Sequence, residues 1–80
     1  MLNTLAQSLR VYNVEVDVHN NAKDGFGISV YLRTSPSATL LINTYFVSAD
    51  DETMFEDVDG KLLSSYGVTL DVMSKVNSNL

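Results

Sequence analysis

Two consecutive segments of this chain, Tyr12–His19 and Phe26–Arg33, alternate apolar and polar residues with a period of two, and this pattern limits the fold more than any other feature. Successive side chains of a strand point to opposite faces, so we expect both segments to form strands that are buried on one face. We expect a third strand over Ala38–Val47, with apolar residues on both of its faces. Residues typical of turns, Asn20–Gly25 and Thr34–Ser37, separate the segments. The sequence therefore predicts a three-stranded antiparallel β-meander.

The alternation also predicts which side chains share a face of the sheet. We expect one face to pack against helices and the other to remain open. The packed face is expected to carry Val14, Val16, Val18, Ile28, Val30, Leu32, Leu40, Ile42 and Phe46. The open face is expected to carry Tyr31, Leu41, Tyr45 and Val47, with Glu15 and Asp17 across the same surface.

Helical spacing of apolar residues precedes and follows the meander. Leu2, Leu5, Ala6 and Leu9 predict a short helix over residues 2–10. A second stripe with helical spacing consists of Met54, Phe55, Val58, Leu62 and Tyr66. Ser48 is placed to cap that helix, and the acids that follow it suit the positive end of the helix dipole.

The last part of the chain has two interpretations. Gly67 is placed to end the preceding helix, and Thr69 is placed to cap a last helix that contains Val72, Met73 and Val76. The alternative is a fourth strand, because Tyr66, Val68, Leu70 and Val72 also alternate. We favour the helix. The sequence thus predicts one α+β domain over residues 1–80, with a short N-terminal helix, the meander and one or two C-terminal helices on one sheet face.

The negative charge of the chain is concentrated in its second half. The net charge is −5, from ten acidic and five basic residues, and no basic residue lies between Arg33 and Lys61. Proteins that bind nucleic acids or anionic membranes need cations that face the phosphates, so we expect neither as a direct partner. Six acids fall within residues 50–59, here called the acidic segment: Asp50, Asp51, Glu52, Glu56, Asp57 and Asp59.

Residue types that perform catalysis or bind metals are scarce. The chain has no cysteine and one histidine, His19, which does not suffice for a zinc site. Gly25-Phe26-Gly27 lacks the third glycine and the following helix of a dinucleotide loop. Asp57-Val58-Asp59-Gly60 resembles part of a calcium loop, but Phe55 and Tyr66 would then occupy two ligand positions. We therefore predict no catalytic residues, no metal and no cofactor, and a protein that is not an enzyme.

The start of the chain and its apolar runs indicate where it acts. The N-terminus lacks the basic region and apolar core of a secretory signal, and no apolar run approaches the ~20 residues of a membrane span. We expect a cytoplasmic protein.

The acidic segment and the open face are the candidate binding surfaces. One interpretation of the acidic segment is a solvated helix face whose first acids serve the helix dipole. The other is an anionic patch that meets a basic surface of another protein. Aromatic residues with a polar rim, as expected on the open face, suit a protein interface. The alternative is that the last helix or a second copy of the chain covers that face.

Two families have the same order of elements. The outline resembles a double-stranded RNA-binding domain, but such domains carry a lysine cluster where this chain has Asp50-Asp51-Glu52. In size, charge and element order the chain resembles small acidic phage proteins that inhibit CRISPR effectors. The matching segments are Tyr12–Val16, Gly27–Arg33 and Asp50–Asp59. Some members of that family place acidic side chains in the channel where the effector would bind target DNA, and the resemblance implies the same use of the acidic segment.

These observations predict a non-enzymatic inhibitor that acts through protein contacts. We expect it to be phage-encoded, to act in the host cytoplasm and to block the nucleic-acid-binding surface of a CRISPR effector or another nucleic-acid-handling protein. The alternatives are an immunity protein or antitoxin that blocks a toxin, and a small homodimeric structural or assembly protein. The expected partner-binding residues are Asp50, Asp51, Glu52, Glu56, Asp57, Asp59, Tyr31, Tyr45, Glu15 and Asp17.

Overall fold

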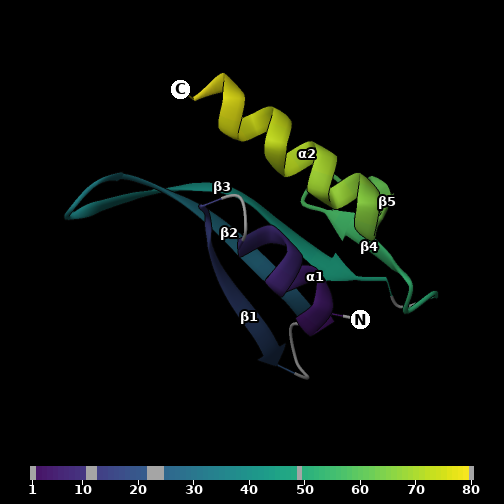
Figure 1. The fold of residues 1–80 in the computed structure, drawn as a ribbon. Helices are drawn as coiled ribbons and strands as arrows, with labels where there is room; N and C mark the ends of the chain where they lie inside the picture. The colour runs from purple at the N-terminus through teal and green to yellow at the C-terminus, as the bar shows by residue number, and fades with distance from the viewer. Residues whose placement is uncertain (1, 11–12, 22–24, 49, 80) are drawn as a thin grey trace.

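The computed structural model describes residues 2–10, 13–21, 25–48 and 50–79. They form two helices and one antiparallel sheet, in which each strand pairs with the next strand of the chain in the order β1-β2-β3-β4-β5 (Figure 1). In chain order the elements are α1 (Leu2–Arg10), β1 (Glu15–Asn21), β2 (Gly25–Ser35), β3 (Ala38–Val47), β4 (Met54–Asp57), β5 (Leu62–Ser64) and α2 (Ser65–Ser78).

The predicted N-terminal helix and the three-stranded meander are confirmed. Residues 2–10 form α1, and residues 38–47 form β3 with the predicted bounds. The predicted β1 residue Tyr12 and the predicted turn residue Asp24 lie outside the described residues. Gly25, the next residue of that turn, has φ +86°, a conformation that glycine adopts without the steric cost of a side chain.

Both helices pack on the same face of the sheet, and the core lies between them and the strands (Figure 1). The buried side chains come from both helices and from four of the five strands or the residues that adjoin them. The core consists of Leu5, Leu9, Val14, Ile28, Val30, Tyr45, Phe55, Val68 and Val72. Neither helix has the length and apolarity needed to cross a membrane, as far as the described residues go.

The long helix predicted after the meander is wrong, because β4 and β5 form a fourth and fifth strand there. Phe55 of β4 pairs with Leu63 of β5. Gly60 in the connecting turn has φ +82°, which an α-helix cannot accommodate. The Asp57 carboxylate supports this turn by accepting hydrogen bonds from the backbone N–H groups of Asp59 (2.9 Å) and Lys61 (2.8 Å).

The C-terminal helix is confirmed over the alternative strand, but it begins earlier than predicted. Ser64 is its N-cap, and the Ser64 hydroxyl accepts a hydrogen bond from the Gly67 N–H at 3.0 Å. Gly67 therefore lies in the first turn of α2 and does not end a preceding helix. Thr69 lies inside the helix and is not its cap. Val68 and Val72, one turn apart, are the fully buried residues of α2.

A β-bulge in β3 reverses the predicted faces in the second half of that strand. Val30 pairs with Asn43, and Tyr31 pairs with Leu41, so Ile42 has no partner in the register. The extra residue shifts the alternation by one position. Tyr45, predicted on the open face, is paired with Ile28 and is fully buried.

The same shift applies to two neighbours of Tyr45. Val47, predicted on the open face, packs against the core, whereas Phe46, predicted on the packed face, lies on the opposite side of β3. Tyr31 and Leu41 were predicted to share the open face, and this prediction is confirmed because they pair with each other in the register.

Candidate functional site: the open face of the sheet

The sheet has one face that no described helix covers, and this face is the candidate site. Residues paired directly across antiparallel strands share a face, so the register defines its members from β1 to β5. We call it the open face; it contains Glu15, Asp17, His19, Gly27, Ser29, Tyr31, Arg33, Leu41, Thr44, Phe46, Glu56 and Leu62.

A row of hydrogen bonds crosses the middle of the open face. His19 Nε2 lies 2.7 Å from Ser29 Oγ, and Ser29 Oγ lies 3.1 Å from Thr44 Oγ1. The three side chains belong to β1, β2 and β3, which are neighbours in the sheet. Ser29 is only 4% exposed, so its hydroxyl is satisfied within the row and is screened from solvent. The row fixes the orientation of the His19 side chain, which the sequence did not indicate.

Apolar side chains lie exposed on both sides of this polar row. Leu41 on β3 and Leu62 on β5 are each 52% exposed. Phe46 is half-buried and is paired with Gly27. Because Gly27 has no side chain, the Phe46 ring lies close to the Gly27 backbone. Exposed apolar residues bordered by polar ones are typical of protein interfaces. Leu62 was missed by sequence reasoning, because its place on this face depends on the unpredicted strand β5.

One acidic residue of the open face is already neutralised. Glu15 Oε1 lies 2.8 Å from Arg33 Nη2, and both side chains are about half exposed. This pair lies across β1 and β2, next to Tyr31, the residue directly opposite Glu15. Of the two acids that the sequence placed here, the exposed Asp17 is therefore the better candidate for contact with a cation.

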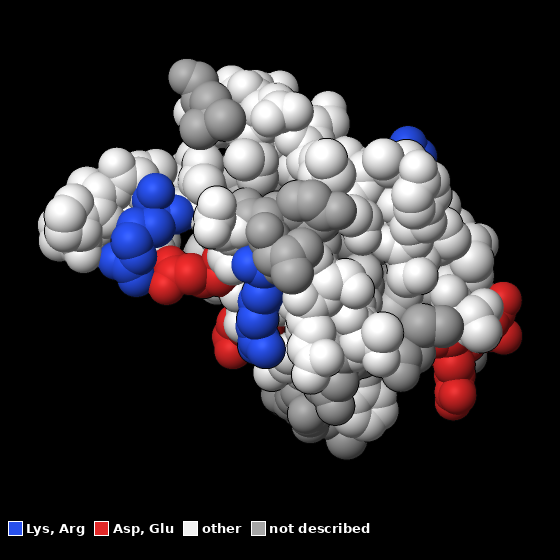
Figure 2. All heavy atoms as spheres, in the orientation of Figure 1, with Lys and Arg blue, Asp and Glu red and all other residues white. Residues whose placement is uncertain are grey.

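The acidic segment does not form one patch. Asp50, Asp51 and Glu52 lie in the β3–β4 loop, whereas Asp57 and Asp59 lie at the other end of β4. A four-residue strand spans about 13 Å, which separates the two groups. In Figure 2 the acidic side chains on the right lie over the β3–β4 loop, and no basic side chain lies beside them in this view. The prediction that these acids open a helix is wrong.

Two acids of the segment serve the backbone. Asp51 Oδ1 accepts hydrogen bonds from the Thr53 hydroxyl (2.7 Å) and the Thr53 N–H (2.9 Å), and these bonds lower the pKa of Asp51. Asp57 supports the β4–β5 turn in the same manner. Within the described parts of the chain, the carboxylates of Asp50, Glu52, Glu56 and Asp59 accept no such bond. Of these, Glu56 lies on the open face, where it pairs with both Phe46 and Leu62.

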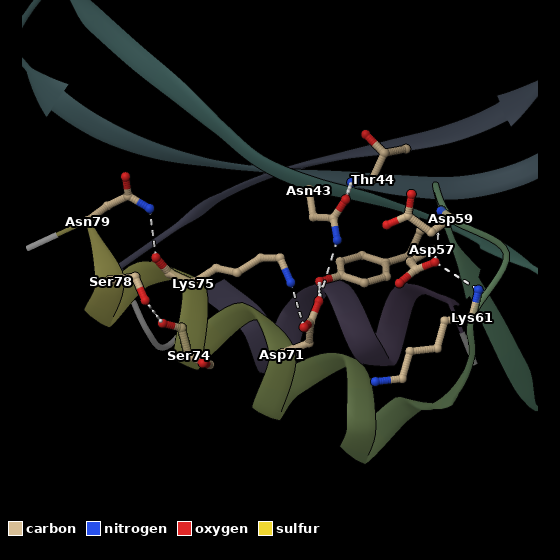
Figure 3. A network of polar contacts seen from close by, with 11 residues as sticks. Asn43, Thr44, Asp57, Asp59, Lys61, Asp71, Ser74, Lys75, Ser78 and Asn79 are labelled. Carbon is tan, nitrogen blue, oxygen red and sulfur yellow. Dashed lines mark hydrogen bonds and ion pairs between the residues drawn. The ribbon is translucent and has the colours of Figure 1, made fainter.

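Tyr45 takes part in a polar network on the packed side of the sheet (Figure 3). Its phenol donates a hydrogen bond to Asp71 Oδ2, and Asn43 Nδ2 lies 3.4 Å from the same oxygen. The other oxygen of Asp71 accepts from Lys75 Nζ at 2.6 Å. Tyr45 thus links β3 to α2 and is not an exposed anchor for a partner. Sequence reasoning did not single out Asp71, although an acid at helical spacing from Lys75 was a signal that it could pair.

Burial and hydrogen bonds shift the titration of both groups. Burial raises the pKa of the Tyr45 phenol, and its bond to the Asp71 carboxylate raises it further. Partial burial alone would raise the pKa of Asp71, but the bonds from Lys75, Tyr45 and Asn43 outweigh it and lower that pKa. The network therefore keeps a neutral phenol against an ionised carboxylate.

A shallow groove of about 240 Å³ lies between the two helices, on the opposite side of the molecule from the open face. Its lining consists of Thr4, Leu5, Ser8, Ser65, Tyr66 and Thr69. The described residues contain no cluster of three or more histidine, aspartate or glutamate side chains arranged to hold a metal ion.

Comparisons with known proteins found no matching family model, no similar curated protein and no similar solved structure.

Proposed function

We propose that this protein is a non-enzymatic, anti-CRISPR-like inhibitor that uses the open face and its acidic margin to occupy a basic, nucleic-acid-binding surface of a host protein. The observation that carries the proposal is the pair of exposed leucines, Leu41 and Leu62, on a face that also presents the carboxylates of Asp17 and Glu56. Burial of these leucines by a partner lowers the free energy of the complex. The carboxylates select a partner that has cations around an apolar centre.

The charge distribution supports a basic partner. The chain carries ten acids against five basic residues, and two of the basic side chains, Arg33 and Lys75, are already paired with Glu15 and Asp71. Basic grooves that bind nucleic acids attract such a surface from a distance and associate with it quickly at low salt. A bound inhibitor then excludes the nucleic acid, because both compete for the same cations.

The structure changes which acids are suitable for a test. Charge reversal by Asp57→Lys would disturb the β4–β5 turn. A loss of binding by that variant would therefore not distinguish a lost partner contact from misfolding. Glu56 and Leu62 face the open side, and Leu62 is largely exposed. The double variant Glu56→Lys with Leu62→Lys therefore changes the charge of the open face and leaves the hydrogen bonds of the β4–β5 turn in place.

The matched control changes two exposed residues on the helix side. Tyr66 and Leu70 of α2 are 72% and 48% exposed. The variant Tyr66→Lys with Leu70→Lys adds cations there and leaves the open face unchanged.

The test measures target-DNA binding by CRISPR effector–guide RNA complexes in mobility-shift assays with increasing amounts of each variant. The wild-type chain and the helix-side control should inhibit an effector, and the open-face variant should lose potency by about tenfold or more because cations then face cations. Inhibition should weaken as salt is raised. Affinity capture from host lysate with the same three proteins extends the assay to other nucleic-acid-binding proteins. The proposal is wrong if the open-face variant inhibits and captures partners as well as the wild-type chain.

A further inference from the structure

The outer edge of β1 is an unpaired strand edge in the described part of the chain. β1 is the first strand of the sheet order and pairs there only with β2. Its seven residues make it longer than β5, the three-residue strand at the opposite edge. An exposed strand edge presents backbone donors and acceptors that favour pairing with another strand.

Alternation along the strands determines which backbone groups face that edge. The Ser48 N–H donates to the Met54 carbonyl at 2.9 Å, so the backbone groups of Ser48 face β4. Backbone groups of successive residues face opposite sides of an antiparallel strand. Those of Tyr45 therefore face β2, and those of its partner Ile28 face β3.

The same alternation extends to β1. The backbone groups of Ser29 face β1 and those of its partner Asp17 face β2, which leaves Val16 and Val18 with outward-facing groups. A second contact agrees, because the Arg10 guanidinium reaches the Val16 carbonyl from outside the sheet at 3.4 Å. This contact is long and exposed, so another donor can replace it at little cost.

We propose that β1 pairs with β1 of a second copy of this chain, antiparallel, across a two-fold axis at Val18. Val18 is the middle residue of Glu15–Asn21, so this register uses the whole strand. Its outward-facing backbone groups pair with those of Val18 in the second copy, and Val16 pairs with Asn20 of that copy. The two half-buried Val18 side chains meet beside the core.

Charge complementarity selects the same register. Asp17 lies opposite His19 of the second copy, in a pair without direct backbone hydrogen bonds, where side chains approach most closely. The two-fold axis repeats this contact. If the axis lay at Asp17, the Asp17 side chains of the two copies would face each other. If it lay at His19, the two His19 side chains would do so. A shift to Val16 would oppose Glu15 and Asp17.

The polar row of the open face prepares His19 for this contact. With Thr44 donating to Ser29 and Ser29 donating to His19 Nε2, the ring proton lies on Nδ1. Nδ1–H then donates to the Asp17 carboxylate of the second copy. The inference does not rest on the proposed function, because it concerns the sheet edge and needs no other partner, although both use the Asp17 carboxylate.

The first experiment is a charge-swap cycle measured by sedimentation equilibrium of the full chain. The wild-type protein should show a monomer–dimer equilibrium. Asp17→His opposes two histidines at each contact and His19→Asp opposes two aspartates, so each should raise the dimer dissociation constant about tenfold, since each contact occurs twice. The double variant restores an opposite pair and should recover most of the affinity.

A second experiment tests the backbone pairing. Val18→Pro removes the outward N–H at the proposed axis without removing a β1–β2 hydrogen bond, and it should abolish the dimer. Leu62→Pro, at the opposite edge, is the matched control and should leave the dimer intact. Circular dichroism and thermal unfolding verify that both variants fold. A chain that stays monomeric at millimolar concentration, or a dimer that is insensitive to the charge swap, would overturn the proposal.

Discussion

The Tyr45 phenol donates a hydrogen bond to the Asp71 carboxylate and thereby joins the middle strand of the sheet to the C-terminal helix. The contact lies at the boundary of the core, where Asn43 and Lys75 complete the hydrogen bonding of the same carboxylate (Figure 3). An ionised group that is partly withdrawn from water needs such partners, so the network stabilises the packing of α2 on β3.

Asp71→Asn should lower the free energy of unfolding by about 1–3 kcal/mol, because the charge-assisted hydrogen bonds from Tyr45 and Lys75 are weakened together. Urea unfolding followed by circular dichroism measures the loss. Lys75→Ala is the control: the Lys75 side chain is 42% exposed, and such a pair within a helix contributes only about 0.3–0.5 kcal/mol. Equal losses for the two variants would show that the Tyr45 contact adds no stability.

Stability should fall in acid partly through Asp71. Its pKa is lower in the folded protein than the value of about 3.9 expected in the unfolded chain. The contribution of Asp71 is therefore fully present above about pH 4 and is lost as the pH falls through the lower folded pKa. Urea midpoints between pH 5 and pH 2 should drop less in Asp71→Asn than in the wild-type chain. The same drop in both would rule out this role.

Alkaline conditions should destabilise the protein through Tyr45. The pKa of its phenol is higher in the folded protein than the value of about 10 in the unfolded chain. Its contribution is fully present below about pH 10 and is lost as the pH rises from there towards the folded pKa. Near-ultraviolet tyrosinate absorbance should show that the Tyr45 phenol ionises only when the protein unfolds. This late-titrating group should be missing in Tyr45→Phe.

Replacement of two glycines by alanine should change the stability of the protein in opposite directions. A Cβ at Gly27 would meet the Tyr45 carbonyl oxygen and lie 2.9 Å from the Phe46 ring, so Gly27→Ala should cost about 1–3 kcal/mol. At Gly67 the nearest atoms, on Leu63 and Ser64, are 3.4 Å away. Gly67→Ala should therefore raise stability by about 0.5–1 kcal/mol through helix propensity. Thermal unfolding separates the two, and a stabilised Gly27→Ala would contradict the close packing on the open face.

The two acids of the β4–β5 turn should differ in the same way. Asp57→Ala removes the acceptor of two backbone N–H groups and should lower the free energy of unfolding by about 1–2 kcal/mol. Asp59→Ala should change stability by less than about 0.5 kcal/mol, because Asp59 is exposed and contributes only its backbone to the turn. Chemical denaturation of both variants checks this order.

The first half of the fold was predictable because its signals are local. A period of two in Glu15–His19 and Phe26–Arg33, with turn residues between them, determines strand identity without knowledge of distant contacts. Leu5 and Leu9 of α1 are likewise on the face that their spacing predicted.

The second half was not predictable in this way because two readings fit the same spacing. Met54, Phe55 and Val58 have the spacing of a helical stripe. In the structure Phe55 is a buried residue of a strand, and Val58 is exposed in a turn. Asp59-Gly60 was the competing turn signal, and its left-handed glycine decides in favour of the hairpin.

The candidate site was partly predictable for the same reasons. Asp17 and Tyr31 were placed on the correct face by alternation in β1 and β2. Tyr45 was placed on the wrong face, because a bulge adds one residue to β3 and no residue type in that strand indicates a bulge. The hydrogen-bonded row through Ser29 depends on the register between strands, which a single sequence does not specify.

The strand order of the sheet, which follows the order of the chain, determines how quickly this protein can fold. Every strand finds its partner in the next strand along the chain, and each loop to be closed is short. Strand pairing between neighbours in the chain favours rapid folding, and for a domain of mixed helix and sheet we expect a time on the order of milliseconds. On a ribosome the sheet can assemble hairpin by hairpin as it emerges, and it gains its last cover only when α2 supplies Val68 and Val72.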